Sequence, residues 1–467
     1  MTIGLSPRAW RVASGAGLAV GIAYVLSPLT VWFAIAMILL FRWTVNGVEG
    51  GERRWIATVL IAAIVLRVIA IGGLFVLTDH SKVVFGSFFG DEEYFIKRSI
   101  WLRNVALGIP IHSADLIYAF DDYSKTSYLY VLALVQLLVG PAQYGVHLMG
   151  VAFYLAASVM LYRLVRSSLG AMPALIGIVL LLFLPSLFAW SISALKEPLF
   201  FMLTASSVVL AVKAARGPGW RVRLPAVVLI VPVVAALQTI RDAGGVLGAV
   251  STVGGLAIGV VITRPRLLIP ILVALPIAIG ATLSRPTVQY AAYTAVQNAA
   301  RQHWGHVATP GYVYRALDDR FYPDRSEISD MQLAETARYV VRSLERYITV
   351  PLPWEVQSTS ALAYIPEQIV WYLIIALLPP GIVFACRRDA IVAGLLFCHA
   401  AVAAVTVALI SGNIGTLVRH RGLALPYLVW LSAVGACELF GMARRPALAR
   451  TAGPPDRAHA FTRTEST

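Results

Sequence analysis

Residues 55–78 read WIATVLIAAIVLRVIAIGGLFVLT, an apolar run interrupted by one charged residue, Arg67. A helix needs about 20 such residues to cross a bilayer, and this run is long enough. The whole chain has the same character, since 58% of its 467 residues are hydrophobic and 13% are charged, with a mean hydropathy of +0.75. Soluble proteins carry about 25% charged residues. We therefore predict an all-α, polytopic bundle of transmembrane helices.

Apolar runs of similar length recur along the chain and predict about 10–12 spans in total. Residues 12–41 contain Ser27-Pro28 near their middle and form either a hairpin of two short helices or one long tilted helix. Arginines on both flanks favour the hairpin. Residues 127–139 would extend only about 20 Å as a helix, so we place them at the outer interface or as a re-entrant piece. The other candidate spans are 143–165, 171–191, 197–213, 224–240, 246–262, 268–284, 366–386, 390–410 and 424–441.

Lysine and arginine are concentrated in the loops between alternate spans. Such loops face the cytoplasm in most membrane proteins, which assigns 163–170, 213–223, 263–266 and 386–389 to that side. This bias accounts for the net charge of +14 without a nucleic-acid partner. We expect an integral, multi-pass protein of a bacterial inner (cell) membrane, in contact with membrane lipids and with a cytoplasmic C-terminus.

These assignments divide the chain into consecutive parts. Both outer segments are expected to contain interfacial helices, and the Ala/Pro/Arg-rich tail is expected to be disordered. The parts are an N-terminal apolar hairpin with a cytoplasmic loop (1–54), a transmembrane core (55–284) that includes a first outer loop (79–142), a second outer segment (285–365), the C-terminal spans (366–441) and the cytoplasmic tail (442–467).

Three consecutive acids, Asp91, Glu92 and Glu93, begin a segment that continues YFIKRSIWLRNVALG. The apolar spacing predicts an amphipathic helix from Asp91 to Leu107 that lies flat on the membrane. In one interpretation the acids are solvated first-turn residues that suit the helix dipole. In the other, a carboxylate at the water–lipid boundary has a raised pKa and acts as a base. The polar side of this helix would carry Lys97, Arg98 and Arg103.

The pattern Asp91-Glu92-x-Tyr94 directly after a span resembles the first outer loop of the GT-C superfamily of integral-membrane glycosyltransferases, which includes the protein mannosyltransferase-like (glycosyltransferase family 39-like) enzymes. Further elements with similar spacing extend the resemblance over roughly residues 55–215, so that 55–284 would be a GT-C-like core. These elements are Tyr128, Leu132 and Val139-Gly140, then Tyr162-Arg163-Leu164-Val165-Arg166 with Gly170, and Pro185 with Ser193-Ala194-Leu195-Lys196-Glu197-Pro198-Leu199.

The resemblance implies transfer of a sugar from a polyprenyl-phosphate donor to a glycan, lipid or protein acceptor at the outer face, in envelope glycan or glycoconjugate synthesis. It also implies that Asp91 is the base that activates the acceptor, with Glu92 as its nearest competitor and Tyr94 beside the substrate. Three consecutive acids leave the choice within Asp91–Glu93 open. The sequence requires no cofactor and is compatible with a divalent metal ion.

A phosphate-bearing donor calls for cations at the outer helix ends, where the topology bias makes them unexpected. Lys196 and Arg241 each have an acid as next neighbour, so Lys196-Glu197 and Arg241-Asp242 are either phosphate ligands or self-neutralising pairs. Arg419 and Arg421 have no acidic neighbour, which favours phosphate or carboxylate binding.

Other candidates are weaker. Trp354 and Glu355 are expected either to bind a sugar or to anchor the chain at the membrane surface. His303 and His306 have helical spacing but no third ligand, so we predict no metal site. Arg67 is expected to face the bundle interior and pair there with helix carbonyls or a buried acid.

Two other functions fit parts of the sequence. An envelope polysaccharide polymerase or ligase would also use outer arginines, but needs no Asp-Glu-x-Tyr after a span. A transporter or flippase of lipid-linked or small substrates would be expected to show paired repeats or polar residues at the membrane midplane.

Overall fold

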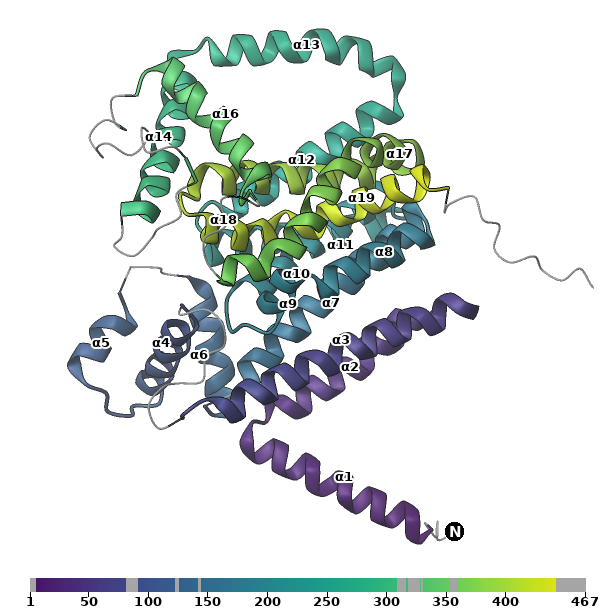
Figure 1. Cartoon of the computed structure of the whole chain (residues 1–467), viewed down its shortest axis with the longest axis vertical. Coiled ribbons are helices and arrows are strands. Elements are labelled where there is room, and N and C mark those ends of the chain that lie inside the picture. Colours follow the sequence, from purple (N-terminus) through teal and green to yellow (C-terminus); the bar gives the residue numbers. More distant parts are fainter. Residues whose placement is uncertain are drawn as a thin grey trace, which may run out of the picture.

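The computed structural model describes residues 6–80, 91–121, 126–141, 144–308, 316–317, 328, 331–352, 354 and 359–441. These ranges contain no β-strand, which confirms the all-α fold (Figure 1). The helices are α1 (Pro7–Leu26), α2 (Leu29–Val45), α3 (Gly50–Leu77), α4 (Asp91–Ala106), α5 (Ser113–Ala119), α6 (Ser127–Val139), α7 (Gly145–Leu169), α8 (Ala171–Phe183), α9 (Pro185–Ser191), α10 (Glu197–Arg216), α11 (Trp220–Ile240), α12 (Gly244–Thr263), α13 (Pro265–Leu283), α14 (Pro286–Ala308), α16 (Leu333–Thr349), α17 (Thr359–Ile410), α18 (Ile414–His420) and α19 (Leu425–Leu439).

Most predicted spans correspond to helices. In the described ranges, 6 helices are long and apolar enough to cross a membrane, or up to 9 if each sharply bent pair counts as one span. The long helix α17 is counted once, although non-helical backbone at Asp389 divides it where the sequence predicts a loop between two spans. At the N-terminus, α1 and α2 are separate helices that meet at Ser27-Pro28, as the hairpin interpretation predicts (Figure 1).

The helices pack closely where small residues face one another. A Cβ on Gly255 or Gly259 of α12 would come within 2.6 Å of the α17 backbone. Gly381 of α17 and Gly435 of α19 make equally close approaches to backbone atoms of the facing helix. Small residues allow this approach between helices in a membrane, where dispersion contacts stabilise the packing.

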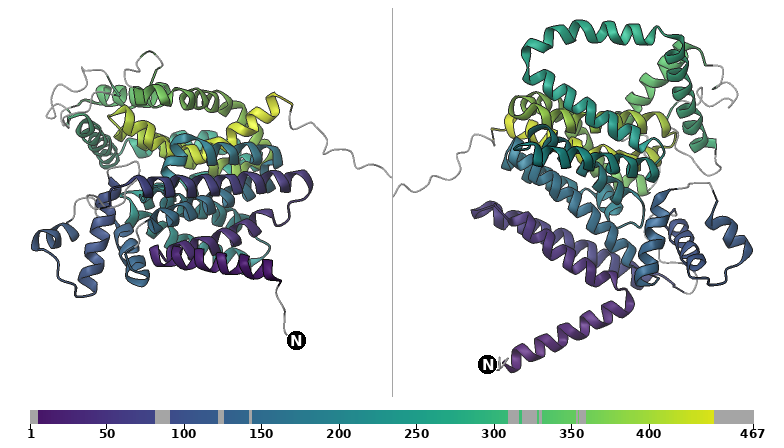
Figure 2. Two further views of the ribbon diagram at one scale, coloured as in Figure 1. Left: turned by 60° about the horizontal axis from the view of Figure 1, so that its bottom comes forward. Right: turned by 180° about the vertical axis from the view of Figure 1, so that it is seen from behind.

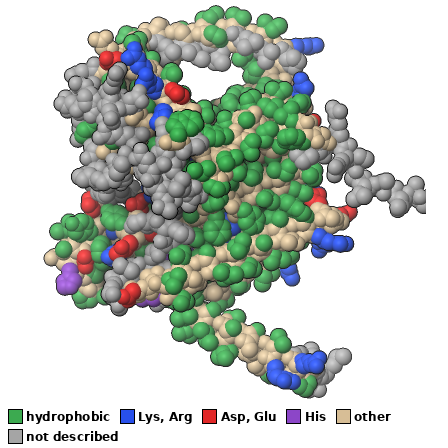
Figure 3. All heavy atoms as spheres, viewed as in Figure 1, with side chains coloured by type: hydrophobic (Ala, Val, Ile, Leu, Met, Phe, Trp, Pro, Cys, Tyr) green, Lys and Arg blue, Asp and Glu red, His purple; other side chains and the backbone are tan. Residues whose placement is uncertain are grey.

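Charged residues collect at the two ends of the bundle, with a broad hydrophobic band between them (Figure 3). One end, here called the arginine end, carries Arg166, Arg216 and Arg388. Each of these arginines pairs with an acid, namely Glu52, Asp389 and Glu438 in that order. Arg166 donates to the two carboxylate oxygens of Glu52 at 2.6 and 2.9 Å, so this pair is bidentate.

The opposite end, here called the cavity end, carries two helical additions. Helices α4, α5 and α6 form one group beside it, and α14 and α16 form another (Figures 1 and 2). Helix α13 runs apart from the bundle, and Figure 3 shows an opening beneath it. Helix α6, over the segment predicted to lie at the interface or to be re-entrant, packs on α4 with buried Leu129 and Leu132.

Polar side chains make local bonds in two of these added helices, α4 and α16. Arg98 of α4 is buried rather than solvated, because its guanidinium donates to the Asp121 carbonyl at 2.6 Å and to the Tyr94 hydroxyl at 2.6 Å. Helix α16 begins at Leu333, and the carboxylate of Glu335 accepts from the backbone N–H of Gln332 at 3.0 Å. This bond is part of a capping box at the first turn of the helix.

Candidate active site at the cavity end

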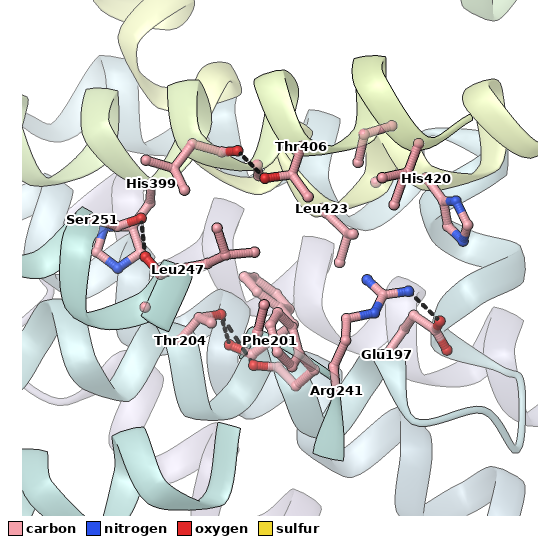
Figure 4. A pocket seen from close by; sticks show the side chains of 18 of the residues that line it. Glu197, Phe201, Thr204, Arg241, Leu247, Ser251, His399, Thr406, His420 and Leu423 are labelled. Atoms are coloured by element: carbon pink, nitrogen blue, oxygen red, sulfur yellow. Dashed lines mark hydrogen bonds and ion pairs between the residues drawn. The ribbon is translucent and has the colours of Figure 1, made fainter. Parts of the chain in front are cut away.

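A cavity of about 510 Å³ lies between α10, α12, α17 and the turn that joins α18 to α19. Figure 4 shows Glu197, Arg241 and His420 at one end of it and Ser251 and His399 at the other. The charged lining groups sit at helix ends, whereas the polar groups Thr204, Ser251 and His399 lie further along their helices, and Thr406 and Tyr427 also line the cavity. The cavity therefore joins a charged mouth to a mixed polar and apolar interior.

Two short turns carry the charges of the mouth. The first follows α9 and ends at Lys196, and Pro198 then occupies the first turn of α10, where its missing N–H costs no hydrogen bond. The second joins α11 to α12, and Ala243 adopts a left-handed conformation with φ 59°. A Cβ on Gly244 would lie 2.4 Å from the Leu237 carbonyl oxygen, so only glycine permits so tight a reversal there.

The ion pair at the mouth crosses between these two turns. Arg241 Nη2 lies 3.6 Å from Glu197 Oε1, and the Glu197 side chain is only 5% exposed. The interpretation of Lys196-Glu197 and Arg241-Asp242 as self-neutralising neighbours is therefore wrong for Glu197 and Arg241. Glu197 therefore belongs to the site, although the sequence identifies it only as a neighbour of Lys196.

Lys196 also lines the cavity, and its ammonium lies 5.9 Å from the centre of the Phe95 ring on α4. Burial lowers the pKa of Lys196, and the nearby positive charge of Arg241 lowers it further. The amine thus sits in a site where an added anion would favour its protonated form. This is the electrostatic condition for binding a phosphate.

Asp91, the first residue of α4, pairs with Arg419 of α18. Neither is among the described residues that line the cavity, but the charge of Asp91 acts on Lys196 and that of Arg419 acts on Arg241, so the pair lies close to its charged end. Arg419 donates from both terminal nitrogens to Asp91 Oδ2, each at 3.2 Å. The Asp91 side chain is 63% exposed and the Arg419 side chain is 25% exposed. The structure thus brings together two residues that the sequence nominated separately, although their pairing could not be read from the chain.

The neighbouring candidates on α4 point elsewhere. Glu92 is fully buried and lies 3.1 Å from Nε2 of His147 on α7. The Tyr94 hydroxyl accepts from Arg98, and Tyr94 does not belong to the described residues that line the cavity. Neither geometry resembles the expected position beside a substrate.

Arg421 has a different environment from Arg419. It is fully buried, and it donates to the carbonyls of Tyr347 and Val350 and to Gln368 Oε1 at 2.8 Å. Its guanidinium also lies 4.5 Å from the centre of the Trp371 ring. With its donors used in this way, Arg421 anchors the second outer segment, and the geometry does not fit the expected role in phosphate binding.

The remaining predicted residues lie away from the cavity. Trp354 is 78% exposed and does not line it, and Glu355 lies outside the described residues. His306 lines the cavity, whereas His303 is buried beside Tyr339. Within the described ranges, no group of three His, Cys, Asp or Glu side chains is arranged to hold a metal ion.

Arg67 of α3 supports the neighbouring helix pair α8–α9, which is bent by 67°. It donates to the Leu182 carbonyl at 2.9 Å and to the Ser191 hydroxyl at 2.7 Å. On the other side of the bend, the carboxylate of Glu367 accepts from the backbone N–H of Ser186 at 2.9 Å. These bonds satisfy backbone groups that the bend at Pro185 frees from the helix.

Several lining residues escaped sequence analysis. Thr204, His399 and Tyr427 lie inside runs that were read only as spans, and the Tyr427 hydroxyl donates to Thr204 Oγ1 at 2.6 Å. The available signal was their polarity within an apolar helix, because such residues are costly in a membrane and usually face an interior or a cavity.

Comparison with known proteins agrees with this picture. Residues 127–237 match the family model described as dolichyl-phosphate-mannose-protein mannosyltransferase. The matched part contains Lys196, Glu197 and Thr204, and excludes Asp91 and Arg419. No curated protein and no solved structure matches the chain. The family match confirms the resemblance to GT-C glycosyltransferases that the sequence motifs predicted, and at that level it supports a membrane glycosyltransferase.

Proposed function

We propose that this protein transfers a sugar from a polyprenyl-phosphate donor to an acceptor hydroxyl at the cavity end of the bundle. One observation carries the proposal: the ion pair of Asp91 and Arg419 lies close to the charged end of the cavity, which Lys196 and Arg241 line. A base and several cations around one cavity suit a reaction in which a proton leaves one reactant and a phosphate leaves the other. The acceptor is a glycan, a lipid or a protein.

The chemistry assigns each charge a role. Asp91 takes the proton of the acceptor hydroxyl, and the hydroxyl oxygen forms a bond to the anomeric carbon of the donor sugar. The bond between that carbon and the phosphate oxygen breaks, and its electron pair remains on the phosphate. Lys196, Arg241 and Arg419 stabilise the charge that develops on this leaving group.

The ion pair between Asp91 and Arg419 suggests how the base becomes available. An ion pair this exposed contributes only about 0–1 kcal/mol, so a phosphate can displace the carboxylate at little cost. Arg419 would then hold the donor, and Asp91 would be free to accept a proton. Arg419 would then contact the donor phosphate in place of Asp91, and Asp91 would contact the acceptor hydroxyl in place of Arg419.

The membrane orientation is part of the same proposal. Loops rich in lysine and arginine remain cytoplasmic in most membrane proteins, which places the arginine end and the C-terminal tail in the cytoplasm. The cavity end then faces outward. We propose a bacterial inner membrane and a role in envelope glycan or glycoconjugate synthesis.

Purified protein in lipid nanodiscs tests the function directly. Polyprenyl phosphates with radiolabelled mannose, glucose or arabinose are incubated with cell-envelope extract, and label transfer to extract components is measured together with release of polyprenyl phosphate. Transfer with stoichiometric release of polyprenyl phosphate supports the proposal. Movement of intact donor across a liposome membrane, without release of the phosphate, would instead indicate a flippase.

A further inference from the structure

We propose that Thr126 and Tyr128, at the start of α6, are positioning residues that fix the spacing between Lys196 and Arg241. The inference rests on the proposed function, in which these two cations bind one donor phosphate. Neither Thr126 nor Tyr128 lines the cavity among the described residues. Both act through the backbone of the turns that carry the cations.

Tyr128 holds the turn that ends at Lys196. Its side chain is 1% exposed, and its hydroxyl donates to the Ala194 carbonyl at 3.0 Å. Ala194 lies between α9 and α10, where no helix determines the backbone. The Tyr128 ring also packs edge-on against Phe95, at 6.0 Å between centres, and Phe95 lies beneath the Lys196 ammonium.

Thr126 holds the other turn. Its side chain is 2% exposed, and its hydroxyl donates to the Ile240 carbonyl at 2.6 Å. Ile240 is the last residue of α11 and directly precedes Arg241, so its carbonyl has no partner within the helix. The same hydroxyl oxygen accepts from the backbone N–H of Tyr128 at 3.3 Å and thereby caps α6.

A single rigid element thus contacts both turns. Thr126 and Tyr128 are two residues apart on the first turn of α6, and helix α6 is packed against α4 and α11. A bidentate or bridging grip on phosphate requires two cations at a set separation, and side chains at the ends of short turns would otherwise vary in position. We infer that α6 supplies the reference that keeps them aligned.

Conservative substitutions remove one bond at a time. Tyr128→Phe deletes only the hydroxyl, and Thr126→Val replaces it by a methyl group. Each is expected to weaken binding of polyprenyl phosphate, the product common to all donors of this class, by about three- to tenfold. Thr126→Ser retains the hydroxyl and should restore affinity. Tyr130→Phe is the matched control, because Tyr130 lies on the same helix and is exposed.

Double-mutant cycles separate positioning from general stability. The effect of Tyr128→Phe should disappear in a Lys196→Ala background and persist in an Arg241→Ala background. The effect of Thr126→Val should show the reverse pattern. Full additivity of every pair would overturn the inference, because the hydroxyls would then act on neither cation.

Hydrogen–deuterium exchange of the ligand-free protein gives a readout that needs no donor. Tyr128→Phe should speed exchange in 192–197 and Thr126→Val in 241–246, each with little effect on the other turn. Unchanged exchange at both turns would overturn the inference. If exchange responds as expected but the parent protein binds no polyprenyl phosphate, the proposed donor fails and the positioning of the two turns remains.

Discussion

Adjacent residues of one type have opposite environments in this protein. Asp91 and Glu92 differ by one step on α4, about 100° around the helix, so one carboxylate meets Arg419 and the other enters the interior toward His147. Arg419 and Arg421 also diverge, one paired with Asp91 and one buried among carbonyls. At the scale of single residues, the direction of a side chain decides its role.

The first prediction separates the acids of α4. Asp91→Asn should lower sugar transfer by about 10²–10⁴-fold, because it removes the proton acceptor while preserving the shape of the side chain. The measurement is the rate of label transfer by folded protein in nanodiscs. Glu93→Gln is the control, since Glu93 pairs with Lys97 in the next turn of the helix. Unchanged transfer by Asp91→Asn would remove Asp91 from the mechanism.

The two arginines should respond differently to truncation. Arg419→Ala is expected to weaken binding of polyprenyl phosphate by about ten- to a hundredfold, the value of one charge-assisted contact, with little change in thermal stability. Arg421→Ala should mainly lower thermal stability, because it leaves the carbonyls of Tyr347 and Val350 without their buried donor. If Arg419→Ala and Arg421→Ala are equally stable and lose phosphate binding to the same extent, Arg421 also binds the phosphate.

The lowered pKa of Lys196 predicts a pH dependence of donor binding. Only the protonated amine attracts phosphate. Above the second pKa of the phosphate, about 6, affinity should be constant and should then decline as the pH rises through the pKa of the amine. Because burial and Arg241 lower that pKa, the decline should begin below the usual lysine value of about 10.4. In Lys196→Arg the decline should vanish from this range, since a guanidinium remains protonated. A titration of polyprenyl phosphate binding against pH checks both curves.

At the scale of elements, the break between α8 and α9 shapes the site. A continuous helix through Pro185 would carry the chain past the cavity, whereas the 67° bend directs α9 and the following turn toward it. Trp190 of α9 lines the cavity, and a Cβ on Gly422 would approach its ring to 3.0 Å. The bend persists because polar side chains satisfy the backbone groups that it frees.

Arg67 should therefore be required for stability rather than for chemistry. Arg67→Met leaves the Leu182 carbonyl and the Ser191 hydroxyl without their buried donor, at a cost of about 2–4 kcal/mol in the free energy of unfolding. Titration with a denaturing detergent measures this change. Arg54→Met on the exposed start of the same helix should be nearly neutral. If Arg67→Met lowers the free energy of unfolding no more than Arg54→Met does, the bonds of Arg67 do not stabilise the bend.

At the scale of the molecule, charge and cavity occupy opposite ends of one bundle. Three pairs of arginines and acids lie at the arginine end. At the cavity end, Lys196, Glu197 and Arg241 line the cavity, and the ion pair of Asp91 and Arg419 lies close to it. The bundle thus separates an end rich in lysine and arginine from the end that holds the candidate site. This polarity gives a test of orientation that is independent of catalysis.

A topology reporter inserted after Gly217 should report the cytoplasm, and one inserted after Gly108 should report the outer side. The reason is that Gly217 follows Arg216 at the arginine end, whereas Gly108 follows α4 at the cavity end. Paired alkaline phosphatase and green fluorescent protein fusions measure the two locations. The reversed pattern at both sites would place the candidate active site in the cytoplasm and end the proposal of an outer-face donor.

Local properties of the chain explain why much of the fold was predictable. The apolar runs determine the spanning helices because a bilayer forces backbone groups to bond within the segment. Proline separates α1 from α2, and the short apolar run 127–139 forms the separate 13-residue helix α6. The start of α4 at Asp91 was likewise readable, since acids favour the first turn of a helix. Such features depend on neighbours in sequence, and sequence patterns record them well.

The composition of the candidate site depended on contacts between distant residues. Sequence alone nominated Asp91, Lys196, Arg241 and Arg419 by their charge at outer helix ends, and tertiary structure decided that Asp91 meets Arg419 and that Arg241 meets Glu197. In the tertiary structure Arg421 and Glu92 are buried in the interior. The physical reason is that charge and hydropathy belong to the residue itself, whereas a partner and a direction arise only when helices far apart in the chain pack together.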